Sequence, residues 1–139
     1  MDNFTTFTCF MMRGAMRKID KYLSATLDKF GISVPQSFVL FSLLEEDGST
    51  LKEVGSKCQI DSSSMTVLVD KLENEGLVER KLDSQDRRAI RVFLTAKGRA
   101  LAEEVLLVGA DFNKQVLNLL EEVKEPFRQG LLTIIEKLD

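Results

Sequence analysis

Histidine is absent from this 139-residue sequence, and cysteine occurs only twice. Without histidine the commonest general base and metal ligand are missing, and we find no nucleophile paired with a base, phosphate loop or metal-ligating cluster. We therefore do not expect an enzyme, and we predict no catalytic residue, metal or cofactor. The two cysteines lie far apart in apolar company, which favours reduced thiols in the cytoplasm over a disulfide framework.

Long apolar runs are absent as well. None approaches the length of a membrane span, and the start lacks the pattern of a signal peptide, so we expect a cytoplasmic protein without a membrane partner. The length, together with a hydrophobic content of 44%, suits one domain with its own core.

An excess of positive charge is also lacking, because the formal net charge is −3. The charge is unevenly distributed, however. Residues 80–99 hold seven cations and two anions, a local charge of +5, whereas residues 100–139 hold four cations and eight anions, a local charge of −4. DNA responds to a local basic patch, so the net charge does not exclude a nucleic-acid partner.

Residues 61–76 predict a short amphipathic helix. Apolar residues recur at helical spacing and should face inward, namely Met65, Leu68, Val69 and Leu72. The opposite face is small and polar enough to approach another surface closely, and it carries Ser63, Thr66, Val67, Asp70 and Asn74. Asp61 or Ser62 can cap the first turn, and Gly76 suits the end of the helix.

Two β-compatible runs follow at residues 77–82 and 89–94, on either side of a polar loop. Thr95 is placed to cap another helix. A helix followed by a hairpin with arginines at its tip is the outline of a winged helix. In such a module the helix enters a major groove, and the wing reaches an adjacent minor groove or a row of phosphates.

Several short motifs stand in a fixed order across this region. A polar-started helix leads into Leu72-Glu73, and it is followed by Gly76-Leu77-Val78-Glu79-Arg80, Asp86-Arg87-Arg88, Leu94-Thr95 and Lys97-Gly98. This ordered set resembles the signature of MarR-family transcription regulators. The resemblance implies a mainly α winged helix-turn-helix with a small β wing and long N- and C-terminal dimerisation helices. It also implies a repressor that binds double-stranded DNA at a pseudo-palindromic operator as a homodimer.

Apolar stripes at both ends of the chain are longer than one core needs. Residues 4–30 predict one helix, and residues 96–120 predict another, with a final helix after a break at Glu125-Pro126. Between them, Ser33-Val34-Pro35 begins a helix that is nearly apolar all round and should be buried, and Thr50 to Lys57 forms a short one. We expect residues 1–139 to form a single MarR-type domain. In it, residues 33–99 are the DNA-binding lobe, and residues 4–30 and 100–139 are dimerisation helices.

The candidate DNA contacts lie on the helix and on the wing. Arg87 and Arg88 could form only a solvated turn, but two adjacent arginines in a +5 segment favour DNA contact. Four hydroxyl side chains lie near the start of the helix, namely Ser62, Ser63, Ser64 and Thr66. A hydroxyl there can cap the helix, or it can donate a hydrogen bond to a phosphate or a base edge. Lys71 is expected to meet a phosphate.

The resemblance implies further roles. Asp86 and Arg88 match wing positions that support and make DNA contact, and Asp70 and Arg80 match an ion pair that braces the wing. A small aromatic or anionic effector is implied in a cleft between the dimer helices and the DNA-binding lobe. We expect its lining to include Met16, Arg17 and Phe38. An effector would shift DNA affinity only by preferring one spacing of the two recognition helices.

Cys9 supports an alternative, a thiol-based repressor. One MarR subgroup senses organic hydroperoxides through a cysteine near the start of the first helix, separated from a Pro-Gln pair as Cys9 is from Pro35-Gln36. The tyrosines that bond the thiolate there are replaced here by Arg13, Leu23 and Val34. Arg13 would favour a thiolate, but apolar neighbours disfavour one, so we expect a buried, unreactive thiol. A remote alternative is a winged helix for protein contacts, which would not need the wing arginines.

Overall fold

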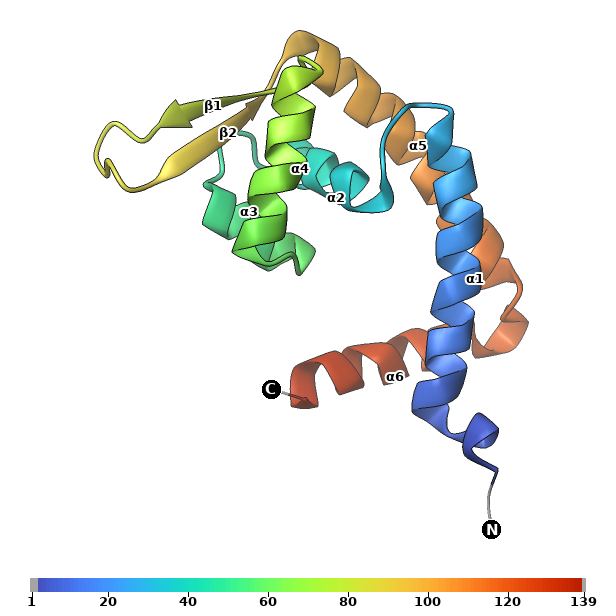
Figure 1. Cartoon of the computed structure of the whole chain (residues 1–139). Coiled ribbons are helices and arrows are strands. Elements are labelled where there is room, and N and C mark those ends of the chain that lie inside the picture. The colour runs from blue at the N-terminus through green and yellow to red at the C-terminus, as the bar shows by residue number, and fades with distance from the viewer. Residues whose placement is uncertain (1–2, 139) are drawn as a thin grey trace. The chain divides into compact units, whose positions relative to one another are not determined.

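The computed structural model describes residues 3–138, which form helices and one two-stranded sheet (Figure 1). In chain order the elements are a 3-10 turn (Phe4–Thr6), α1 (Thr8–Asp28), α2 (Val34–Glu45), α3 (Leu51–Cys58), α4 (Ser62–Asn74), β1 (Val78–Leu82), β2 (Ile90–Leu94), α5 (Ala96–Asn118), a second 3-10 turn (Glu121–Val123) and α6 (Lys124–Lys137). The mainly α fold with a small β wing is confirmed. The chain divides into two compact units, and the boundary between them falls within α5. The first unit ends at Leu106 and the second begins at Leu107.

The core lies in the first unit, where α2 packs against α3, α4 and the hairpin. The side chains that are fully covered include Val39, Leu40, Leu43, Val54, Met65, Val69, Leu72, Val78, Val92 and Val105. The predicted inward face of α4 is confirmed, although Leu68 is only half-buried. Burial of this apolar row fixes the rotation of α4, so its polar row faces outward.

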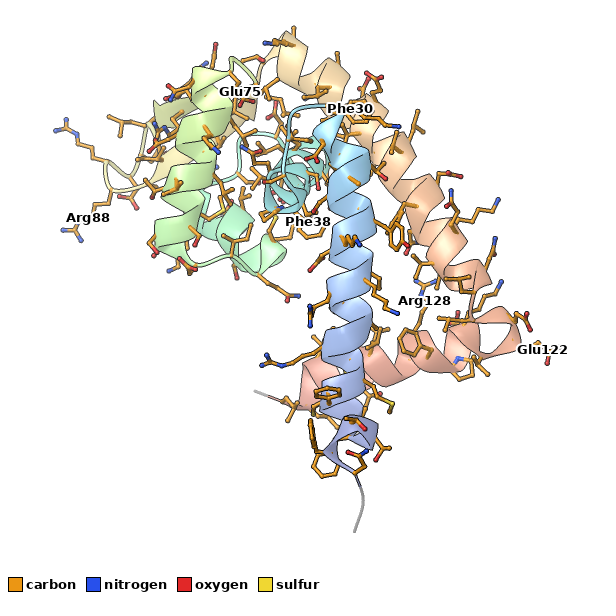
Figure 2. All side chains as sticks on the ribbon, turned by 45° about the vertical axis from the view of Figure 1, so that its right-hand side comes forward. Phe30, Phe38, Glu75, Arg88, Glu122 and Arg128 are labelled. Atoms are coloured by element: carbon orange, nitrogen blue, oxygen red, sulfur yellow. The ribbon has the colours of Figure 1, made fainter. Side chains whose placement is uncertain are left out.

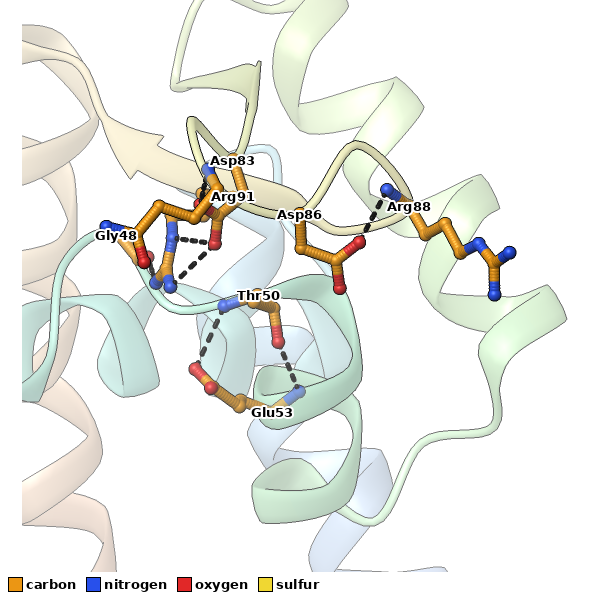
Figure 3. Close-up of polar contacts among 8 residues, drawn as sticks. Gly48, Thr50, Glu53, Asp83, Asp86, Arg88 and Arg91 are labelled. Atoms are coloured by element: carbon orange, nitrogen blue, oxygen red, sulfur yellow. Dashed lines mark hydrogen bonds and ion pairs between the residues drawn. The ribbon is translucent and has the colours of Figure 1, made fainter.

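Local capping explains where α2, α3 and α5 begin. Ser33 and Gln36 form a capping box at the start of α2, and Thr50 and Glu53 form another at the start of α3 (Figure 3). The predicted Thr95 cap is also present, because its hydroxyl oxygen accepts a hydrogen bond from Gly98 N at 2.9 Å. Each box satisfies backbone N–H groups that would otherwise lack a partner at the start of a helix.

The hairpin is fastened to the loop between α2 and α3. β1 and β2 pair antiparallel, with Val78 opposite Leu94 and Leu82 opposite Ile90. In the middle of β2, Val92 exchanges backbone hydrogen bonds with this loop, since its N–H donates to Ser49 O and its carbonyl accepts from Gly48 N, both at 2.9 Å. The hairpin therefore leaves the lobe in a fixed direction beside α4.

Close backbone contact joins the start of α5 to the start of the hairpin. Gly98 is buried, and a Cβ atom added there would lie 1.8 Å from the carbonyl oxygen of Leu77. The same oxygen accepts a hydrogen bond from Thr95 N at 3.1 Å. Only glycine permits this approach, which explains physically why Gly98 belongs in the motif.

Both terminal helices differ from their predicted bounds. The expected helix over residues 4–30 is wrong at its start, because Phe4–Thr6 is a 3-10 turn, Phe7 is extended and α1 begins at Thr8. Near the other end, α5 stops at Asn118, and Glu121 has a positive φ of 50°. The break therefore precedes Glu125-Pro126, and Pro126 lies within the first turn of α6, where a missing N–H costs nothing.

Exposed apolar side chains gather on the terminal helices. At the start of the chain they include Phe4, Phe7, Phe10, Met11 and Met16, and on α6 they include Phe127, Leu132, Ile134 and Ile135. In the second unit, none of residues 107–138 is buried.

The expectation that α2 is buried all round is wrong at Phe38, which is 44% exposed. No helix within residues 3–138 is long and apolar enough to cross a membrane.

Candidate nucleic-acid interface

The N-terminus of α4 is organised by the carboxylate of Asp61. Asp61 Oδ1 accepts hydrogen bonds from Ser63 Oγ at 2.7 Å and from Ser64 N at 2.8 Å, and Oδ2 accepts one from Ser64 Oγ at 2.9 Å. Because these two hydroxyl protons are given to Asp61, Ser63 and Ser64 present acceptor oxygens to the outside rather than donors. Of the two roles that the sequence left open, these bonds correspond to ordering the start of the helix, and a contact with DNA stays a prediction.

The hydrogen bond from Ser63, followed by those from Ser64, lowers the pKa of Asp61 from 3.8 to about 2. A carboxylate with a lowered pKa adds stability that is fully present above its ordinary pKa and is lost as pH falls through the folded value. We expect Asp61→Asn, which keeps an acceptor but does not titrate, to show a shallower fall of the urea midpoint between about pH 4 and pH 2. Identical slopes for the variant and the wild type would contradict this role of Asp61.

Arg80 joins α4 to β1 through two carboxylates. Its Nη2 lies 2.6 Å from Asp70 Oδ1 and 3.0 Å from Glu73 Oε1. The ion pair implied for Asp70 and Arg80 is therefore present. Glu73 was not predicted, and it also accepts a hydrogen bond from Arg80 N at 2.9 Å. The side-chain hydrogen bond from Arg80 lowers the pKa of Glu73, so the ion pair persists to lower pH than an unpaired glutamate would allow.

A second tie holds the outer part of the hairpin. Arg91 Nε donates to Asp83 Oδ2 at 2.9 Å, and Arg91 Nη1 donates to the carbonyl oxygen of Gly48 at 2.8 Å (Figure 3). Near the base, Asp47 accepts hydrogen bonds from Leu94 N at 2.8 Å and from Arg99 Nη2 at 3.2 Å. These contacts connect the wing and the start of α5 to the loop after α2, and they pair Arg91 of the wing and Arg99 of α5 with carboxylates.

Arg87 and Arg88 remain at the tip of the hairpin. Both are exposed, and neither forms an ion pair within residues 3–138. Arg88 N donates to Asp86 Oδ1 at 2.9 Å, which fixes the turn, while the guanidinium of Arg88 points away from the ribbon (Figures 2 and 3). Most of the predicted +5 charge is thus compensated locally, and the two tip arginines are the cations most available to a partner.

A groove of about 760 Å³ lies between α3, the start of α4 and the wing. Its lining includes Lys52, Ser62, Thr66, Asp86 and Arg88. The Thr66 hydroxyl donates to Ser62 O at 3.1 Å, and Lys71, which is exposed further along α4, lies outside the groove lining. Much of the lining is apolar, including Leu51, Ile60, Met65 and Ile90, and beside these residues stand cations and hydroxyl groups of the kind that contact a phosphate backbone.

The remaining candidate residues are spread over α1 and α2. Met16 and Arg17 are exposed on α1, whereas Phe38 lines a separate pocket of about 330 Å³ with Phe41, Ser42, Glu45, Lys57, Cys58 and Gln59. That pocket does not bring Phe38 together with Met16 or Arg17. The burial expected for Cys9 is wrong, because its side chain is exposed in the single chain. Burial raises the pKa of the half-buried Cys58 thiol, which favours an unreactive packing role.

The lobe and its hairpin define the class of protein, a winged helix-turn-helix. The MarR family model matches residues 32–90. The organic hydroperoxide resistance transcriptional regulator of Bacillus subtilis (strain 168) is 30% identical over 133 residues, which cover 94% of this chain and 88% of that protein. The chain belongs to the MarR family and is a DNA-binding transcription regulator.

Solved structures agree with this assignment. A mutant MarR from E. coli, crystallised with operator DNA, is 26% identical to this chain, with a TM-score of 0.82. The match covers 97% of this chain and 99% of the MarR chain. BpsR of Bordetella bronchiseptica, whose DNA binding is regulated by 6-hydroxynicotinic acid, has a TM-score of 0.90 at 22% identity. The match covers 100% of this chain and 99% of the BpsR chain, and this likeness supports a shared fold.

Proposed function

We propose that this chain is a homodimeric repressor that binds a pseudo-palindromic operator and is released by a small effector. The observation that carries the proposal is the pair of exposed arginines at the wing tip, Arg87 and Arg88, which form no ion pair among residues 3–138 and lie beside the groove between α3, α4 and the wing. As a DNA-binding regulator, the protein would work in the cytoplasm, where bacterial DNA lies.

The DNA contacts are proposed from the exposed groups of α4 and the wing. Ser62, Thr66 and Lys71 would contact the backbone or base edges from α4, and Arg87 and Arg88 would contact phosphates or the minor groove from the wing. Ser63 and Ser64, as acceptors, suit base edges that donate, such as the amino groups of adenine and cytosine. The contacts of Arg80 and Asp86 would brace the wing, with Asp70 neutralised so that it does not repel DNA.

A second copy of this chain would cover the exposed apolar side chains of residues 4–30 and 100–139, leaving residues 33–99 as the DNA-binding lobe. Exposed aromatic and aliphatic groups in such number are typical of subunit interfaces. Two copies related by a two-fold axis present two α4 helices, which matches a pseudo-palindrome. Sedimentation velocity should show a dimer at micromolar concentration with and without DNA. A monomer under both conditions would contradict the proposal.

We propose that the effector binds at the exposed face of α1 that carries Met16 and Arg17, and that Phe38 of α2, which lines a separate pocket in the single chain, joins this site only when the effector is bound. The exposed aromatic ring and guanidinium suit a small aromatic anion, because the ring can stack and the cation can pair with a carboxylate. The experiment is a screen of aromatic acids for release of the protein from operator DNA. An aromatic acid that releases the wild type from operator DNA but releases Arg17→Ala less would support this position. Equal release of both proteins would place the effector elsewhere.

The second candidate function is a repressor that peroxide inactivates through Cys9. Its support is the Bacillus subtilis relative, named for organic hydroperoxide resistance, together with the exposure of Cys9. Against it, no hydrogen bond among residues 3–138 reaches the Cys9 sulfur, and a sensor thiol needs stabilisation of its thiolate.

We expect stoichiometric cumene hydroperoxide to leave operator binding unchanged. The measurement is fluorescence anisotropy of labelled operator before and after peroxide, for wild type and for Cys9→Ser. Cys58→Ser serves as the control for the other thiol. If peroxide releases wild type but spares Cys9→Ser, the thiol-based function replaces the ligand-responsive one.

A further inference from the structure

Val67 is exposed in the middle of α4. Its side chain is 61% exposed, although it stands two residues from the buried Met65 and two from the buried Val69. At about 100° per residue, this spacing places Val67 on the side of the helix opposite the buried row. Ser63 and Asn74 share its outward row. Val67 therefore stands at the centre of the face that the lobe turns outward.

No packing among residues 3–106 explains a valine at this position. Valine loses rotamer freedom in a helix and forms helices less readily than alanine or the straight-chain polar residues. A valine that is 61% exposed also recovers little burial energy. Its neighbours on this face are short, namely Ser63, Thr66 and Asp70, and Asp70 is held by Arg80 at 2.6 Å. The two methyl groups of Val67 are consequently free to contact a partner.

We infer that Val67 recognises thymine by placing its methyl groups against the C5-methyl group of that base in the major groove. The inference rests on the proposed function, in which α4 enters this groove. The thymine methyl is the apolar feature of the major-groove edge, where other positions carry hydrogen-bond donors and acceptors. A valine opposite another base would remove water from a polar edge without replacing its hydrogen bond. Val67 is thus a specificity-determining residue rather than a source of general affinity.

The test compares thymine with deoxyuridine, which differs only by the missing methyl group. A duplex selected from random DNA by the wild-type protein is synthesised with deoxyuridine at each thymine of the half-sites in turn, and affinities are measured by fluorescence anisotropy. One position should weaken wild-type binding about fourfold per half-site, the scale of burying one methyl-sized group, and about fifteenfold when both half-sites are changed. For Val67→Ala the ratio at that position should fall to about one.

Leu82→Ala is the matched control. Leu82 is also exposed, at 69%, but it lies on β1 of the wing. The minor groove displays no thymine methyl group, so this variant should keep the wild-type ratio. Equal binding of thymine and deoxyuridine duplexes by wild type, or a ratio that persists in Val67→Ala, would overturn the inference while leaving DNA binding intact. Failure of the wild type to select any duplex would instead overturn the proposed function.

Discussion

Replacing Arg88 with alanine is expected to abolish tight operator binding while leaving the fold intact. The Arg88 guanidinium is exposed and contacts no carboxylate within residues 3–138, so its removal costs the folded chain little. A hydrogen bond to a charged group is worth about 1.5–3 kcal/mol, and a dimer loses two such groups. Affinity at physiological salt should therefore fall at least about a hundredfold. Anisotropy titration measures the loss, and circular dichroism checks the fold.

The salt dependence separates this contact from an internal role. Arg87→Ala should weaken binding and flatten the log–log salt slope by about 0.9 for each lost phosphate contact, or about 1.8 for a dimer. Arg91→Ala is the contrasting variant, because Arg91 is tied to Asp83 and Gly48 inside the hairpin. It should lower affinity without changing the slope. If Arg87→Ala and Arg88→Ala both bind like wild type, the wing assignment is wrong.

Gly98→Ala is expected to produce the largest loss of stability. The added Cβ would lie 1.8 Å from Leu77 O and 2.7 Å from Leu77 C, and both are backbone atoms that cannot turn aside as a side chain can. Overpacking of a closed site costs about 1–3 kcal/mol, and backbone contacts this short place the variant at or above that range. Urea unfolding followed by circular dichroism measures the difference in the free energy of unfolding.

Gly14→Ala provides the control for that experiment. Gly14 lies within α1, and a Cβ there would meet nothing within 4 Å among residues 3–138. Alanine in the interior of a helix is favoured over glycine by roughly 0.5–1 kcal/mol, so this variant should be unchanged or slightly more stable. A Gly98→Ala protein as stable as wild type would show that α5 and the hairpin do not meet as described.

The sequence predicted those parts of the lobe that depend on local signals. The apolar spacing and Asp61 cap of α4, the two strands and the Thr95 cap each depend on residues a few positions apart, and all are present. The end of α4 at Gly76 also follows from local chemistry, because Gly76 has a positive φ of 72°. Such features need no knowledge of how distant segments meet.

The contacts that hold the wing could not be predicted in the same way. Asp47 meets Arg99 across 52 residues, and Arg91 meets Gly48 across 43. Nothing local distinguishes these charged residues from those left in solvent, so the +5 segment overstated the charge available to DNA. The role of Glu73 could have been predicted, because Glu73 lies one helical turn beyond Asp70 and can therefore pair with the same cation, Arg80. The start of α1 and the break before α6 depend on two 3-10 turns. The spacing of apolar residues does not predict these turns.

Selection of DNA from a random-sequence pool by the purified full-length protein, followed by sequencing, tests the central claim most directly. The claim is that two copies of α4 and of the wing read a two-fold symmetric site. The predicted result is an inverted repeat whose half-sites are centred about one helical turn apart, roughly 34–36 Å. Enrichment of a single unrepeated half-site, or of no common sequence, would contradict it.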